Sequence, residues 1–263
     1  MDIIMSIDIK STNEIIKIRK SCKIASEVLT MIENYIEPGI STEKLNKICH
    51  EYIVKKKHAF PASLGYCGFP KSVCISINDV VCHGIPNKKI ILKDGDILNI
   101  DVAVIKDEYY GDTSKMFFVK DVKKEAIDLC KSTQKSLYLA IKKIHPGMRL
   151  RKIGSIIQKY IESKNYSIVR EYCGHGIGKC FHEEPQILHY DAYDKEIKLK
   201  PGMIFTIEPM VNIGSKNVYT GKDGWTVKTK DKSLSAQYEH TILITNYGCE
   251  VMTLREEELL LKQ

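Results

Sequence analysis

The sequence has no apolar run that approaches the roughly 20 residues needed to cross a bilayer. Residues 1–6 have neither the basic segment nor the long apolar core of a signal peptide. We therefore expect a cytoplasmic protein that makes no membrane contact. The composition is ordinary for a globular chain, with 43% hydrophobic and 28% charged residues.

Paired cysteine spacing is also missing. Nine cysteines are scattered along the chain without a CxxC pair, so the spacing of a zinc finger is absent. An odd number of cysteines without an export signal favours reduced thiols. The net charge of +7 is modest and is compatible with weak attraction to a polyanion. It gives no reason to expect DNA binding.

Similar segments recur at nearly constant spacing. Pro146-Gly147 and the residues that follow repeat the pattern at Pro38-Gly39. Residues 199–208 likewise repeat residues 92–101. Two unrelated helix–strand units could resemble each other once, but two matches at nearly the same offset favour a duplication.

The duplication places Glu208 where Asp101 stands in the first copy. We expect a single domain over residues 1–263, with halves of roughly 12–120 and 121–252. A pseudo-twofold relation between the halves would aim equivalent strand ends at one central point, and distant acids would converge there.

Local patterns predict helices followed by strands in each half. A capping box at Ser11 and Glu14 begins a helix with one apolar stripe, which ends at Pro38-Gly39. Further helices are expected near 122–144 and 149–163.

Residues 73–77 and 80–82 predict a β-hairpin with a turn at Asn78-Asp79. In a strand predicted over 97–105, four apolar side chains share one face, while Asn99 and Asp101 share the other. Helices should cover the apolar face and leave the acids facing a cleft.

Five polar side chains lie inside or at the ends of apolar strands, and they suggest a metal centre: Asp101, Asp112, His175, Glu208 and Glu239. Each acid alone is better interpreted as a turn or edge residue. Together they are not, because burying carboxylates side by side costs roughly several kcal/mol per ion unless cations compensate. Two divalent metals would compensate, and four carboxylates with one imidazole suit Mn²⁺, Fe²⁺ or Co²⁺, with Zn²⁺ possible. The pattern predicts a two-metal hydrolase.

Along almost its whole length the chain resembles the methionine aminopeptidases. The resemblance is carried by 71–78, 81–86, 99–102, 111–114, 174–178, 181–185, 207–209 and 237–241. It implies the pita-bread fold, an α/β (α+β) architecture in which helices cover a curved antiparallel sheet. The separation of Glu208 and Glu239 leaves no room for the helical insert of type II enzymes, so the chain is similar to the short, prokaryotic-like type I form. The family implies a monomer.

The resemblance also implies roles for the five ligands. Asp101 binds one metal, His175 and Glu208 bind the other, and Asp112 and Glu239 bridge both. A hydroxide shared by the two metals attacks the first peptide bond, and Glu208 is the expected general base. His83 and His182 correspond to two histidines that bind no metal. One should contact the substrate near the scissile nitrogen, and the other should stabilise the oxyanion.

By the same resemblance, a pocket for the substrate methionine is expected from Tyr66, Phe69, Cys74, Phe181 and Trp225, with Ser63 nearby. For any one of these residues, core packing is the simpler interpretation. Phe69, Ser63 and Cys67 replace a tyrosine, a cysteine and a histidine of the usual family pattern, so the details of the pocket stay open.

The expected substrates are the N-termini of nascent polypeptides with a small second residue. Residues 212–232 hold five lysines, which predict a solvated basic loop or a contact with the ribosome surface.

Two other functions share this fold. An X-Pro dipeptidase uses the same metals but usually has an additional N-terminal domain. Metal-free binding modules of this fold lose metal ligands, whereas all five positions are filled here.

Overall fold

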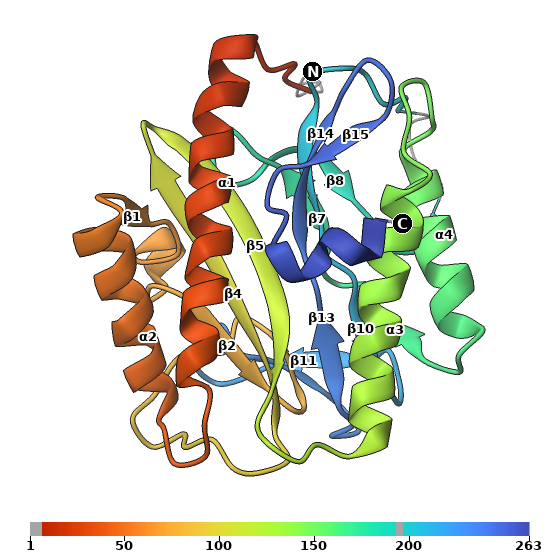
Figure 1. The fold of residues 1–263 in the computed structure, drawn as a ribbon. Helices are drawn as coiled ribbons and strands as arrows, with labels where there is room; N and C mark the ends of the chain where they lie inside the picture. Colours follow the sequence, from red (N-terminus) through yellow and green to blue (C-terminus); the bar gives the residue numbers. More distant parts are fainter. Residues whose placement is uncertain (1–6, 193–196, 263) are drawn as a thin grey trace.

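In the computed structural model, residues 7–192 and 197–262 are described. Two pairs of helices stand on either side of the molecule, with antiparallel strands between and behind them (Figure 1). The first pair is α1 (Thr12–Ile32) and α2 (Thr42–Glu51), and the second is α3 (Lys124–Ile141) and α4 (Arg151–Glu162). The expected mixed architecture of helices over antiparallel sheets is confirmed.

The capping box predicted at the start of α1 is present. The Ser11 side chain accepts a hydrogen bond from the Glu14 backbone N–H, and the Glu14 carboxylate accepts one from the Ser11 backbone N–H at 2.9 Å. The helix ends earlier than expected, at Ile32, and a 3₁₀ turn over Glu33–Tyr35 leads to Pro38. The α-helix therefore ends before the Pro38-Gly39 breaker is reached.

Two larger sheets organise the strands. The first contains β1 (Phe60–Pro61), β2 (Cys74–Ile77), β4 (Ile97–Lys106) and β5 (Tyr109–Phe118), with β4 paired to the other three. The second has the order β15 (Cys249–Val251), β14 (His240–Ile244), β9 (Ile204–Ile207), β7 (Gly174–Gly176) and β8 (Glu183–Ile187).

Two smaller sheets complete the fold. One joins β13 (Ser235–Gln237), β10 (Met210–Asn212) and β6 (Ser167–Ile168). The other joins β11 (Val218–Thr220), β12 (Val227–Thr229) and β3 (Val80–Cys82). The predicted turn at Asn78-Asp79 is present, and the Ile75 N–H donates to the Gly84 carbonyl at 2.9 Å. The predicted ladder between β2 and β3 is wrong: β2 pairs with β4, and β3 pairs with β12, which comes from the other half of the sequence.

The two halves meet along β5. The Thr113 hydroxyl donates to the Glu239 carbonyl at 2.7 Å, and the Glu239 N–H donates to the Ser114 carbonyl at 3.1 Å. The Thr241 hydroxyl donates to the Asp112 carbonyl at 2.7 Å. This seam places two of the predicted metal ligands, Asp112 and Glu239, on adjacent backbones.

Equivalent backbone hydrogen bonds occur at the repeated segments. The N–H of Gly39 donates to the carbonyl of Leu92, and that of Gly147 donates to Leu199. Gly95 and Gly202 both have a φ of +88°, and their N–H groups donate to Val119 and Ile244 at 2.9 Å. These paired contacts support the proposed duplication.

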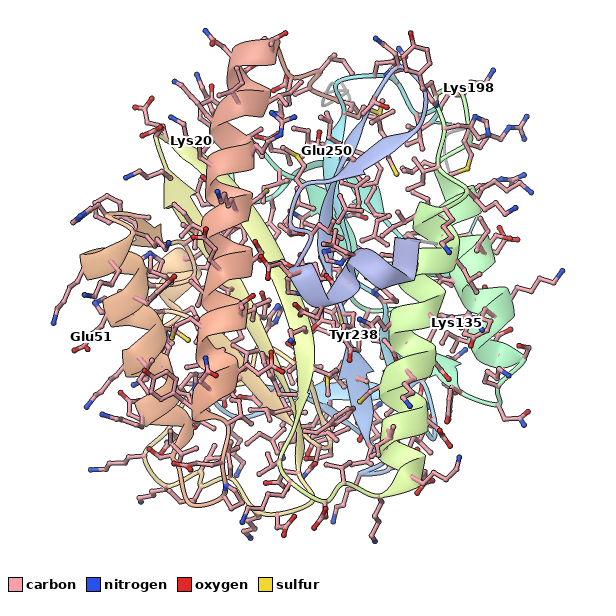
Figure 2. The ribbon with its side chains drawn as sticks, in the orientation of Figure 1. Lys20, Glu51, Lys135, Lys198, Tyr238 and Glu250 are labelled. Atoms are coloured by element: carbon pink, nitrogen blue, oxygen red, sulfur yellow. The ribbon has the colours of Figure 1, made fainter. Side chains whose placement is uncertain are left out.

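Each helix pair covers its own apolar core. The predicted apolar face of β4, made of Leu98, Ile100, Val102 and Val104, packs with the buried faces of α1 and α2. The second core centres on α3, α4 and the fully buried Phe205 of β9. Figure 2 shows the labelled Glu51 at the edge of the molecule and Tyr238 in its interior. Asn99 and Asp101 are left facing away from the helices, as the alternation predicts.

A substitution at Gly111 tests the packing of α1 on β5. A Cβ at this position would lie 2.3 Å from the Cys22 nitrogen and 2.5 Å from the Ser21 carbonyl carbon, both backbone atoms that cannot move aside locally. Gly111→Ala should lower the free energy of unfolding by about 1–3 kcal/mol, the usual cost of overpacking. Gly248→Ala is the control, because its nearest neighbour would lie 3.7 Å away. Equal urea midpoints for the two variants would contradict this packing.

Candidate metal centre and substrate cavity

The five predicted ligands come from both large sheets and converge on one cavity. Asp101 lies on β4 and Asp112 on β5, and His175 lies on β7. Glu208 follows β9, and Glu239 immediately precedes β14. All five line a single cavity of about 260 Å³.

Three of the five are close enough to share one ion. Ligand atoms of Asp112, His175 and Glu239 all lie within 4.8 Å of one another. His175 Nε2 is 3.7 Å from a carboxylate oxygen of Asp112 and 3.7 Å from one of Glu208. Asp101 lines the same cavity, and burial together with the nearby Asp112 carboxylate raises the pKa of Asp101. The five side chains therefore form one cluster.

Unpartnered oxygens in this cluster fit divalent cations. Asp112 Oδ1 and Glu239 Oε1 are buried, and neither has a hydrogen-bond partner in the described structure. Buried polar atoms are almost always satisfied, so such exceptions require an explanation. His175 Nδ1 is 3.0 Å from the Gly176 carbonyl oxygen, which fits a ring that donates there and offers Nε2 as a ligand. An oxygen-rich set with one imidazole suits Mn²⁺, Fe²⁺ or Co²⁺.

Crowding shifts the ionisation of the acids. Burial, reinforced by the neighbouring carboxylates, raises the pKa of Asp101 and of Glu239 well above the ordinary range, and Arg255 partly opposes the rise at Glu239. Burial and Asp112 raise the pKa of Glu208 to about 7, although His175, Thr206 and Gln237 act in the other direction. Without a compensating cation, the cluster therefore retains protons.

Three further residues hold Glu208, and sequence reasoning did not find them. The Thr206 hydroxyl donates to Glu208 Oε1 at 2.8 Å, and Gln237 Nε2 donates to Oε2 at 3.2 Å. The backbone N–H of Glu208 donates to His189 Nε2 at 3.0 Å. A signal was available for two of them, because Thr206 and Gln237 each lie two positions before a predicted ligand. Residues two apart in extended chain point to the same side.

The predicted pocket residues surround the rest of the cavity. Tyr66, Phe69, Cys74, His83, Phe181, His182 and Trp225 all line it, together with Ser63. Their rings pack on one another: Phe69 and Trp225 centroids are 5.2 Å apart, and those of Tyr66 and Phe181 are 4.9 Å apart. Sequence reasoning missed four other lining residues: Glu171, Tyr172, Cys173 and Met210.

The two histidines expected to bind substrate rather than metal stand beside this centre. His182 Nδ1 is 2.7 Å from the Tyr66 hydroxyl, and the His182 ring centroid is 4.2 Å from that of His175. Desolvation and the neighbouring His175 lower the pKa of His182 to about 4. Desolvation also lowers the pKa of His83. Both rings are therefore neutral near pH 7.

Comparisons with known proteins agree with this geometry. The model of metallopeptidase family M24 matches residues 16–246. A protein of Escherichia coli (strain K12) named methionine aminopeptidase is 60% identical over 97% of this chain and 96% of its own length. The chain belongs to the methionine aminopeptidases of family M24. It is a metal-dependent aminopeptidase of the short bacterial type.

Solved structures place the fold in the same family. The methionine aminopeptidase of Rickettsia prowazekii superposes with a TM-score of 0.92 at 50% identity, covering 95% of this chain and all of that one. A prolidase from Pyrococcus furiosus superposes with a TM-score of 0.73 at 25% identity, and only 66% of its length is covered. The pita-bread fold expected from the sequence is thus confirmed. Among the described residues, no helix is long and apolar enough to cross a membrane.

The raised pKa of Glu208 predicts the pH dependence of stability in metal-free protein. Its pKa of about 7 in the fold exceeds the ordinary value of 4.5, so the folded state holds this proton more tightly than the unfolded chain. The contribution of Glu208 to the free energy of unfolding should therefore fall as pH rises from about 4.5 to about 7, and then level off. Glu208→Gln removes the titrating group and is the control.

Urea unfolding of both proteins after removal of metal by a chelator measures this effect. The wild type should lose stability relative to Glu208→Gln as pH rises through that interval. A difference between the two proteins that does not change with pH would show that Glu208 titrates normally.

Proposed function

We propose that the protein removes the N-terminal methionine from nascent proteins and peptides, by hydrolysis at a centre of two divalent cations in the cytoplasm. The observation that carries this proposal is the convergence of Asp101, Asp112, His175, Glu208 and Glu239 on an aromatic cavity. The relatives named methionine aminopeptidase support the substrate class.

As the family resemblance implies, Asp101, Asp112, His175, Glu208 and Glu239 would hold the two cations, with Asp112 and Glu239 as the proposed bridging ligands. When bound, cations in this donor set would polarise the scissile carbonyl and lower the pKa of water at the site. The unpartnered oxygens of Asp112 and Glu239 support this assignment.

Glu208 is the proposed general base. A carboxylate held at the cation cluster can accept a proton from water and return it to the leaving amine. The hydrogen bonds from Thr206 and Gln237 hold both carboxylate oxygens in place, so the base does not need to reorganise during the reaction.

His83 and His182 are proposed to contact the substrate around the first peptide bond. Both rings are neutral near pH 7, so each can donate one N–H hydrogen bond without adding a charge that would repel the cations. If His182 Nδ1 is engaged with Tyr66, Nε2 remains to contact the developing oxyanion or the scissile nitrogen.

The aromatic part of the cavity is the proposed methionine pocket. Tyr66, Phe69, Phe181 and Trp225 offer apolar rings, and a thioether packs well against ring edges. The cavity, about 260 Å³, lies at or below the low end of typical ligand pockets, roughly 300–1,000 Å³. A space of this size suits one side chain and the first peptide bond. We therefore propose that the second residue of the substrate must be small.

Cleavage of short peptides tests the proposed function. With Mn²⁺ added, methionine should be released from Met-Ala-Ser, and roughly 10- to 200-fold more slowly from Met-Leu-Ser, because the larger second side chain fits poorly. The dipeptide Leu-Pro distinguishes an X-Pro dipeptidase and should stay intact.

Glu208→Gln should lower turnover of Met-Ala-Ser by about 10²–10⁴-fold through loss of the base. Near-wild-type turnover in Glu208→Gln with metal bound would refute this mechanism.

Residues 212–232 support a proposed contact with the ribosome. Lys216, Lys222, Lys230 and Lys232 are exposed, and they lie around strands β11 and β12. Lys228 is less available than the sequence suggests, because its ammonium is 3.3 Å from the Asp79 carboxylate. A loop of free lysines attracts RNA phosphates with an affinity that falls steeply as salt increases.

A charge-loss variant tests this contact. The triple variant Lys216, Lys222 and Lys230→Ala should co-sediment less with ribosomes at low salt, while Met-Ala-Ser cleavage stays within about twofold of wild type. The control removes the same charge from exposed lysines around α2, at Lys44, Lys47 and Lys56. Equal co-sedimentation of the two variants would contradict a ribosome contact through residues 212–232. The lysines would then be only solvated side chains.

A further inference from the structure

A buried ion pair lies behind the proposed metal centre, outside the residues that line the cavity. Arg255 is 3% exposed and Glu258 is 1% exposed. Both belong to the C-terminal segment, which runs between α1 and α3 in Figure 1. Arg255 Nη2 donates to Glu258 Oε1 at 2.6 Å. The proposed reaction uses neither residue.

One arm of this pair leads to β5. Arg255 Nη1 donates to the Thr113 hydroxyl at 2.9 Å, and that hydroxyl donates to the Glu239 carbonyl at 2.7 Å. Thr113 directly follows Asp112 in the chain. The guanidinium is thus joined through one hydroxyl to the backbones of both proposed bridging ligands.

The other arm leads to β14. Glu258 Oε1 lies 3.3 Å from Nε2 of His240, the residue after Glu239, and the Tyr138 hydroxyl lies 3.0 Å from the same nitrogen. The opposite ring nitrogen of His240 lies 2.9 Å from the Thr253 hydroxyl, so both sides of the ring are in contact with this segment. Each proposed bridging carboxylate is therefore followed by a residue that contacts the Arg255–Glu258 pair.

Stability alone gives little reason for such a pair. Apolar side chains of similar volume generally stabilise a core at least as well as a buried ion pair. A charged pair differs from apolar packing because its hydrogen bonds are directional, and each one fixes the position of a particular partner atom. Here the contacts of the pair reach Thr113 and His240, each one residue away from a proposed bridging ligand.

We propose that Arg255 is a positioning residue for the metal centre, which, together with Glu258, fixes the strands that present Asp112 and Glu239 to the cations. The inference deepens the proposed function and rests on its assignment of these two carboxylates as ligands. Loss of an outer hydrogen-bond partner of a metal ligand typically lowers metal affinity by roughly 10- to 100-fold.

The experiment measures Mn²⁺ binding to metal-free protein by calorimetry, with circular dichroism to establish folding. The double variant Arg255→Met, Glu258→Leu replaces the pair by apolar side chains and leaves no unpaired charge. Thr113→Val removes the hydroxyl that joins Arg255 to Glu239 and keeps the guanidinium. Arg19→Gln is the matched control, because Arg19 also binds a C-terminal acid, Glu250, at 2.8 Å, but on the exposed surface.

We expect the double variant and Thr113→Val to bind Mn²⁺ roughly 10- to 100-fold more weakly than wild type, and Arg19→Gln to bind normally. Saturating Mn²⁺ should restore most of the Met-Ala-Ser turnover, which it would not do for a general loss of structure. Wild-type affinity in a folded double variant would overturn the proposal. If the double variant does not fold, wild-type affinity in Thr113→Val would overturn it instead.

Failure of the proposed function would look different. In that case wild-type protein would bind Mn²⁺ without releasing methionine, and the affinity differences among the variants would still report on Arg255.

Discussion

Electrostatic crowding around His175 is the constraint on which this structure depends. Four carboxylates share one cavity with one imidazole, and the pKa of three of them is raised by burial and mutual repulsion. No chain would hold such a cluster together without a rigid frame. The frame here is the seam between β5 and the Glu239 backbone, where Thr113, Ser114 and Thr241 bond the two halves to each other. The proposed cations would offset the repulsion between these carboxylates by attracting each of them.

The substrate cavity depends on the same seam. Tyr66, Phe69 and His83 come from the first half of the chain, whereas Phe181, His182 and Trp225 come from the second. The ring contacts cross this boundary, as between Phe69 and Trp225 or between Tyr66 and Phe181. A shift of one half against the other would disturb metal ligands and pocket together. This explains why the centre and the pocket are best understood as a single unit.

Much of this arrangement could be predicted from the sequence where the signal is local. The capping box at Ser11, the alternation along β4 and the position of acids at strand ends are all properties of short segments. Pairing between distant segments was not predictable in this way. β3 pairs with β12 rather than with its neighbour β2, and Lys228 forms an ion pair with Asp79 across that ladder. Thr206 and Gln237 lie two positions before predicted ligands, so a local signal for them existed. The contact of His189 with Glu208 depends on how distant segments pack, which no local pattern records. The family resemblance supplied the roles of His83 and His182, which a lone histidine could not have indicated.

The central claim is that the carboxylate cluster holds two cations and that methionine release depends on them. The most direct measurement titrates metal-free protein with Mn²⁺ while following binding by calorimetry and methionine release from Met-Ala-Ser in parallel. The account predicts no release without metal, uptake of two Mn²⁺ per chain, and turnover that rises as these sites fill. Full turnover in chelator-treated protein, or no turnover in protein with both sites filled, would contradict it.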